Sequence, residues 1–130
     1  MRYIYILFLG ICNSFRYHYG SLYRRELKKR YRIQGLVEDH HIIPKQFTKH
    51  HILEKYNYNI SAPYNIMMLP NKKGQEFLNT NRLLHSGGHR KYNKYVEEKL
   101  EDIENEEDLD NLVQYLRLQM YGNPYNIPWK

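Results

Sequence analysis

The sequence predicts an α+β protein that is mainly helical. Two short segments, 36–43 and 66–69, are each closed by a proline, which biases the preceding residue away from the helical conformation. From residue 89 onward, apolar residues recur every three or four positions, the period of a helix with one buried face. The chain has 130 residues, the length of one ordinary domain. Together these observations predict a few short strands packed among helices.

The composition excludes several classes of protein. A hydrophobic content of 42% and a charged content of 26% are typical of a globular domain rather than a disordered chain. The single cysteine, Cys12, excludes a disulfide framework and any site built from several cysteines. No apolar run approaches the roughly 18 residues of a membrane-spanning helix. We therefore expect a globular domain without a membrane span.

The first 36 residues divide into an apolar segment and a basic segment. Arg2 precedes an apolar run up to residue 12, which has the outline of a short signal peptide. Two tyrosines in the run and the lack of a clear small-residue cleavage site favour a buried strand or helix instead. We expect the protein to act inside the cell, with secretion as the alternative if residues 1–14 are a signal peptide.

Residues 21–31 are predicted to form a basic helix, with Ser21 as its cap and Gly35 closing the stretch. Residues 1–96 carry 17 basic and 5 acidic residues, a balance of +12, whereas residues 97–130 carry a balance of −6. The basic stripe indicates a polyanionic partner, and a solvated helix face is the alternative. The residues of this stripe predicted to contact the phosphates of such a partner are Arg24, Arg25, Lys28, Lys29, Arg30 and Arg32.

The remaining elements follow from local pattern. Residues 45–56 are expected to form a helix, 57–63 a turn-rich loop and 72–84 a weakly defined helix. The helix that begins near residue 89 buries Tyr92, Val96, Leu100 and Ile103, and its other face is acidic. Asn105 then caps a final helix, whose first turn is acidic and which ends at the Gly-Asn-Pro sequence 122–124.

The positions of the histidines suggest a metal site and a neighbouring base. His40 and His41 are neighbours on a predicted strand, so their side chains point to opposite faces and suit two different roles, such as metal ligand and base. Glu38 shares the face of His40 and is placed to accept an N–H from a liganding imidazole. His85 and His89 are four residues apart, so if both lie on a helix their rings project from one face, from which both can reach one divalent cation. An incidental pairing remains the alternative, because the pair His50-His51, interpreted as helix surface or core edge, also occurs.

Three motifs occur in order along the chain, and their combination is far more specific than any one of them. They are Asp39-His40-His41-Ile42-Ile43-Pro44-Lys45, then Asn65-Ile66-Met67-Met68-Leu69-Pro70, then His85-Ser86-Gly87-Gly88-His89-Arg90-Lys91-Tyr92. This pattern resembles the AHH family of the HNH/endonuclease VII superfamily, which also supplies toxin modules. Asp39 departs from the family's usual Ala, and Ile66 from a common Gly.

The resemblance implies a ββα-metal (His-Me) finger over residues 37–104, flanked by 1–36 and by a C-terminal helix and tail, 105–130, within one domain. It implies that His40, His85 and His89 hold one divalent metal ion, Mg²⁺ or Zn²⁺. It further implies that His41 is the general base of an endonuclease and that Asn65 pins the hairpin loop. We expect Arg90 to support the scissile phosphate, and Lys45 and Lys91 to contact nucleic acid.

Three hypotheses follow for the activity. The leading one is a metal-dependent endonuclease acting on nucleic acid, with DNA favoured over RNA. The second is a metal-stabilised nucleic-acid-binding module that has lost catalysis. The third is a secreted, toxin-like nuclease effector, which would need an immunity protein as its partner.

Overall fold

The computed structural model describes residues 21–78, 85, 88–122 and 126–130. Its centre is an antiparallel pair of strands, β1 (Val37–His41) and β2 (Ile66–Pro70), in which His40 lies opposite Met67. Helices surround this pair, so the mixed and mainly helical class predicted from the sequence is confirmed. Residues 1–20, which include the apolar segment and Cys12, lie outside the described part of the chain.

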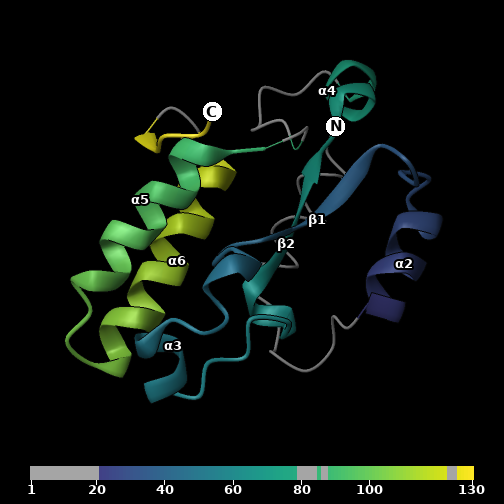
Figure 1. Ribbon diagram of the computed structural model, residues 1–130. Helices are drawn as coiled ribbons and strands as arrows, with labels where there is room; N and C mark the ends of the chain where they lie inside the picture. The colour runs from purple at the N-terminus through teal and green to yellow at the C-terminus, as the bar shows by residue number, and fades with distance from the viewer. Residues whose placement is uncertain (1–20, 79–84, 86–87, 123–125) are drawn as a thin grey trace.

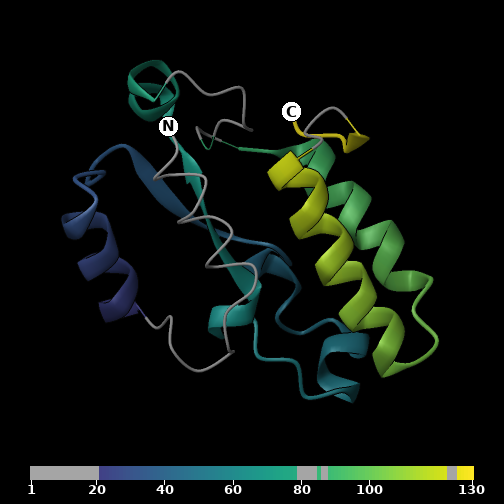
Figure 2. The same ribbon diagram turned by 180° about the vertical axis from the view of Figure 1, so that it is seen from behind.

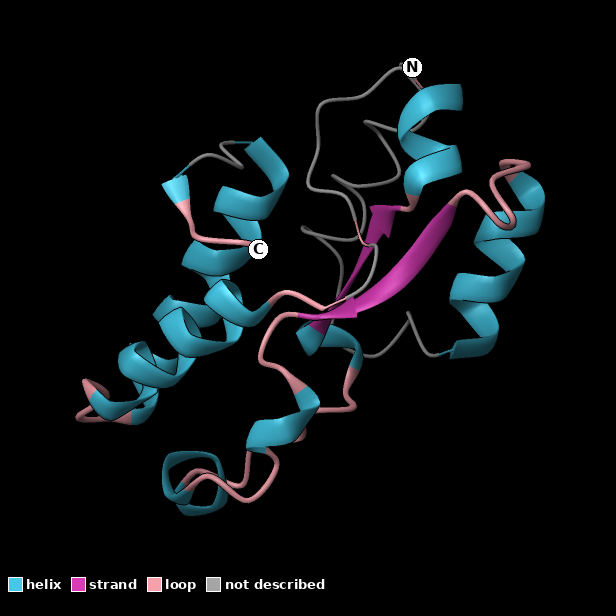
Figure 3. Cartoon of the chain, turned by 45° about the horizontal axis from the view of Figure 1, so that its top comes forward, coloured by secondary structure: helices cyan, strands magenta, loops and turns pink. Residues whose placement is uncertain are grey.

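The long helices flank the two strands on opposite sides. Helix α2 (Ser21–Arg30) lies on one side, and the adjacent helices α5 (Arg90–Glu101) and α6 (Glu106–Gly122) lie on the other (Figure 1). The reverse view in Figure 2 and the tilted view in Figure 3 show the same arrangement. None of the helices in the described ranges is long and apolar enough to cross a lipid bilayer.

The short elements differ from the sequence prediction. The helix expected over 45–56 is divided into a 3₁₀ turn, Lys45–Phe47, and helix α3 (His51–Lys55). The division falls at His50, which has an extended backbone and whose Nδ1 accepts a hydrogen bond from the Ile52 amide, capping α3. Helix α4 (Lys72–Phe77) begins where predicted, and the expected extension over residues 79–84 lies outside the described residues.

One buried cluster joins the strands to the C-terminal helices. Ile42 and Ile43, which follow β1, pack in the same core as Met67 and Leu69 of β2. Helix α5 adds Tyr92, Val96 and Leu100, all fully buried, as the predicted helical period requires. Helix α6 contributes Leu109, Leu112, Val113, Leu116 and Met120. The strands are therefore packed in two clusters: Met67 and Leu69 lie in the cluster of the two long helices, and Val37 and Met68 pack with Leu27 of α2.

Asn65 holds the loop between the strands together. Its side chain is fully buried and donates to the carbonyl oxygens of Ile43 and Ile60, at 3.0 and 2.8 Å. Its Oδ1 accepts from the Ile43 amide and from the Tyr58 hydroxyl, both at 2.8 Å. These contacts occupy both polar atoms of the Asn65 amide, and they are consistent with its predicted role of holding the loop.

Replacing Asn65 by alanine is expected to lower the free energy of unfolding by roughly 3 kcal/mol, because several buried backbone groups lose their partner. Urea denaturation measures this change. Asn59→Ala is the matched control, since the Asn59 side chain accepts one exposed hydrogen bond, from the Ser61 amide, and its loss should cost less than about 1 kcal/mol. Equal losses for the two variants would contradict the structural role of Asn65.

Candidate metal centre

Three histidines from separate parts of the chain meet beside the strands. His40 lies on β1, His85 follows α4 in the sequence, and His89 is the residue before α5. Their ring centroids are 5.1 to 5.9 Å apart, and one ring nitrogen from each lies within 4.8 Å of the others. The three residues expected to bind metal are therefore brought together by the fold.

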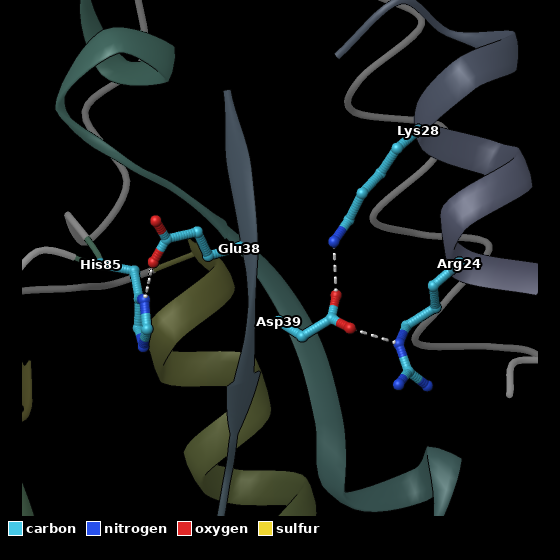
Figure 4. A network of polar contacts seen from close by, with 5 residues as sticks. All are labelled: Arg24, Lys28, Glu38, Asp39 and His85. Atoms are coloured by element: carbon cyan, nitrogen blue, oxygen red, sulfur yellow. Dashed lines mark hydrogen bonds and ion pairs between the residues drawn. The ribbon is translucent and has the colours of Figure 1, made fainter. Parts of the chain in front are cut away.

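Hydrogen bonds fix the protonation of two of these rings. The Nδ1 atom of His85 is 2.7 Å from the Glu38 carboxylate (Figure 4), and Nδ1 of His89 is 2.9 Å from Oδ1 of Asn93. Both oxygens are acceptors, so each Nδ1 carries the proton and donates it. The Nε2 lone pair of each ring is then available to a metal ion, which is the usual arrangement of a liganding histidine.

The burial of a polar ring nitrogen in His40 is explained if this side chain binds a metal ion. The side chain is 1% exposed, and its Nε2 has no hydrogen-bond partner among the described residues. Burial lowers the pKa of His40 well below its ordinary value, and the neighbouring His89 and His85 lower it further. The ring is therefore neutral, and a buried polar atom without a partner costs free energy that coordination of a cation would offset.

Aromatic side chains enclose the histidine cluster. The Trp129 ring lies 5.2 Å from that of His40 and 4.8 Å from that of His89, and Tyr92 lies 5.5 Å from His40. The Tyr92 hydroxyl donates to the Ile42 carbonyl oxygen at 2.6 Å, so this residue belongs to the core. Trp129, the only tryptophan of the chain, thus lies beside two of the candidate ligands.

His41 is partly buried and lies on the wall of a pocket beside the histidine cluster. This pocket has a volume of about 300 Å³ and is lined by Asp39, His40, His41, Pro44, Lys45, His85 and His89. Partial burial lowers the pKa of His41, the positive charges of Lys45 and Arg24 lower it further, and Asp39 acts in the opposite direction. A neutral imidazole thus faces a space that also contains the candidate metal ligands.

The condition for a shared helix face is not met. His85 and His89 do not share a helix face, because α5 begins only at Arg90, with His89 as its N-cap and His85 outside it. The two rings are brought together by different means: His89 by the start of α5, and His85 by its bond to Glu38 and by its amide, which donates to the Pro70 carbonyl oxygen at 2.8 Å.

Arg24 does not suit the phosphate contact predicted for it. It is 7% exposed, and its Nε donates to Asp39 at 2.9 Å, while Lys28 donates to the other oxygen of that carboxylate at 2.8 Å (Figure 4). Burial would raise the pKa of Asp39, but the hydrogen bonds and charges of Lys28 and Arg24 outweigh it and lower the pKa. Asp39, the departure from the family pattern, therefore attaches α2 to β1, and Arg24 is a contact within the protein.

The other basic residues predicted to contact nucleic acid remain at the surface. On and after α2, Arg25, Lys29, Arg30 and Arg32 are exposed, and Lys28 is partly exposed. Lys45, Arg90 and Lys91 are exposed near the histidines in sequence, and of these Lys45 lines the pocket.

Asn93 and Trp129 had no place in the sequence prediction. Asn93 is four residues after His89, a spacing at which helical side chains meet, and this spacing could have identified it. Its Nδ2 donates to Gln46 at 3.1 Å, which orients its carbonyl oxygen toward His89. Trp129 lies forty residues after His89, and no local pattern indicated its contact with the cluster.

The fold and the cluster define a small α+β protein with a candidate centre for a divalent metal. A family comparison matches residues 25–119, most of the chain, to a nuclease family of the HNH/ENDO VII superfamily with a conserved AHH motif. The chain belongs to this AHH nuclease family. Searches of curated proteins and of solved structures give no significant match.

Replacing Glu38 by glutamine is expected to weaken metal binding by about 10- to 100-fold, because the carboxylate that orients the His85 ring is lost. Fluorescence of Trp129, which contacts two of the candidate ligands, reports the titration with Zn²⁺. Glu76→Gln on the exposed face of α4 is the control. Identical titrations for Glu38→Gln and the control would show that Glu38 does not support the centre.

Proposed function

We propose that this protein is a metal-dependent endonuclease that hydrolyses phosphodiester bonds, with DNA as its substrate. The observation that carries the proposal is the buried His40 Nε2, which lacks a partner among the described residues and lies beside two rings whose Nε2 atoms are available. A neutral base, His41, lines the same pocket. Three imidazole nitrogens beside a base form an arrangement suited to metal-assisted hydrolysis.

The residues of the pocket divide the chemistry between them. His41 accepts the proton of the attacking water, as its neutral imidazole permits. Lys45, on the same pocket wall, places a positive charge beside the phosphate, and Arg90 adds a second from the start of α5. A divalent cation held by His40, His85 and His89 supplies Lewis-acid stabilisation of the phosphoryl and leaving oxygens.

The choice of metal follows from the ligands and the substrate together. Imidazole nitrogens favour Zn²⁺ over Mg²⁺, whereas phosphate oxygens suit Mg²⁺, which binds few protein ligands and keeps several waters. Three protein ligands leave positions for water and phosphate in either case. We propose Zn²⁺ or Mg²⁺ as the single ion of the centre.

The exposed basic residues provide a surface for the nucleic-acid backbone. Arg25, Arg30 and Arg32 are exposed on and after α2, and Lys91 is exposed on α5. Because lysine and arginine side chains that contact phosphates read no sequence, we propose that cleavage tolerates many sequences. Asp39 is held by Arg24 and Lys28, so its departure from the family pattern gives no support to a module without catalysis.

The direct test incubates the metal-stripped full chain with supercoiled plasmid, single-stranded DNA or RNA. Mg²⁺, Mn²⁺ and Zn²⁺ are added separately. We expect nicked and then degraded plasmid with at least one metal, no product in EDTA, and slower cleavage of RNA. Retention of plasmid without cleavage with every metal would favour a binding module. Preferential cleavage of RNA would show that the substrate is RNA rather than DNA.

A further inference from the structure

A second group of metal-ligating side chains lies at the opposite end of α5. His50 caps α3, His51 is the first residue of that helix, and Glu101 is the last residue of α5. One ligand atom from each lies within 4.8 Å of the others. His89 and Glu101 bracket the twelve residues of α5, so the two groups are separated by roughly 18 Å. This distance excludes a shared two-metal centre, whose ions lie about 4 Å apart.

The geometry around His50 leaves one nitrogen directed at the carboxylate. Nδ1 of His50 accepts from the Ile52 amide at 3.3 Å, so the ring proton is on Nε2, which lies 2.9 Å from Oε1 of Glu101. The His50 side chain is only 10% exposed, so its ring is held in place. A cation bound between these two atoms would gain a nitrogen and an oxygen ligand that already face each other. The ring proton would then move from Nε2 to Nδ1, and the long 3.3 Å hydrogen bond from the Ile52 amide would be given up.

His51 supplies the third ligand. Its ring stacks on that of His50, with centroids 4.5 Å apart and an angle of 26° between planes. His51 and Glu101 are exposed, so both can adjust to a coordination geometry. Glu101 also ends α5, where the carbonyl end of the helix dipole favours a positive charge. The cap of α3 accounts for the position of His50, and the ion pair with His50 accounts for that of Glu101. Neither interaction accounts for the position of His51 beside them.

We propose that His50, His51 and Glu101 form a second cation site, selective for Zn²⁺-like ions over Mg²⁺, that joins α3 to α5. Two imidazoles and one carboxylate are a donor set typical of zinc, and imidazole nitrogen disfavours magnesium. The exposed basic residues proposed to bind nucleic acid do not include any of the three. A cation bound here would link α3 to α5 and so stabilise the folded state. It would take no part in the proposed nuclease activity.

The test counts zinc ions bound to the metal-stripped full chain by equilibrium dialysis with elemental analysis. Wild type is expected to bind two per chain, and Glu101→Gln and His51→Ala one each, with the second ion weakened by roughly 100-fold. Glu97→Gln, the same change at an exposed site one turn earlier in α5, should bind two. Zinc should also raise the Tm of wild type more than that of Glu101→Gln, because a ligand of the folded state stabilises it.

His85→Ala separates this proposal from the first centre. It should lose one zinc ion and keep the ion that Glu101→Gln removes. If Glu101→Gln and His51→Ala bind zinc with the count and affinity of wild type, the second site does not exist. If instead Glu101→Gln loses an ion while His85→Ala loses none, the second site stands and the centre of His40, His85 and His89 fails.

Discussion

Replacing His41 by alanine is expected to lower the rate of DNA cleavage by about 100- to 10,000-fold, the usual contribution of a positioned general base. His41 points to the opposite strand face from the buried His40 and is only partly buried itself. The substitution should therefore leave the three candidate ligands in place. We expect zinc titrations and plasmid retention to match those of wild type, while product formation in single-turnover plasmid assays falls.

Glu54→Ala is the control for this variant, because Glu54 is exposed on α3 and lies outside the pocket. It should cleave at the wild-type rate. Cleavage by His41→Ala at the rate of this control would remove His41 from the mechanism, and loss of zinc binding would show that its effect passes through the centre.

Replacing His85 by alanine should weaken metal binding by at least about 100-fold and abolish cleavage at metal concentrations that saturate wild type. One of three nitrogen donors is lost, and the Glu38 carboxylate is left without its partner. His85 is preferable to His40 for this test, since its side chain is 23% exposed whereas His40 is buried in the core. Trp129 fluorescence and plasmid assays measure the two effects.

Circular dichroism without added metal provides the control for folding, and the spectra of His85→Ala and wild type should agree. A folded His85→Ala variant that binds metal and cleaves DNA as wild type does would contradict the assignment of His85 as a ligand.

The helices and strands were predictable where burial has a regular period. Tyr92, Val96 and Leu100 repeat at helical spacing, and all three are fully buried on α5. The division of the expected helix at His50 was not predictable, because it depends on a side chain accepting a backbone hydrogen bond. The role of Asp39 was also hidden, since its partners Arg24 and Lys28 lie on α2, fifteen and eleven residues earlier.

The histidines of the candidate site were predictable because their types and spacing form motifs along the chain. The helical spacing of His85 and His89 does not account for their proximity, because His85 lies outside α5 and His89 is its N-cap. Contacts of residues that belong to none of the motifs could not be predicted from the sequence. Trp129 reaches the ring of His89 only because the C-terminal segment returns to α5, where the Tyr92 amide donates to the Trp129 carbonyl oxygen.

The central claim is that the three-histidine centre supports phosphodiester cleavage in which His41 is the base. It is tested most directly by following supercoiled plasmid with metal-stripped wild type, His41→Ala and His85→Ala side by side as divalent metal is added. We predict cleavage that depends on metal in wild type alone, with metal bound by His41→Ala and not by the centre of His85→Ala. Cleavage by wild type that persists unchanged in excess EDTA, or equal cleavage by all three proteins, would contradict the account.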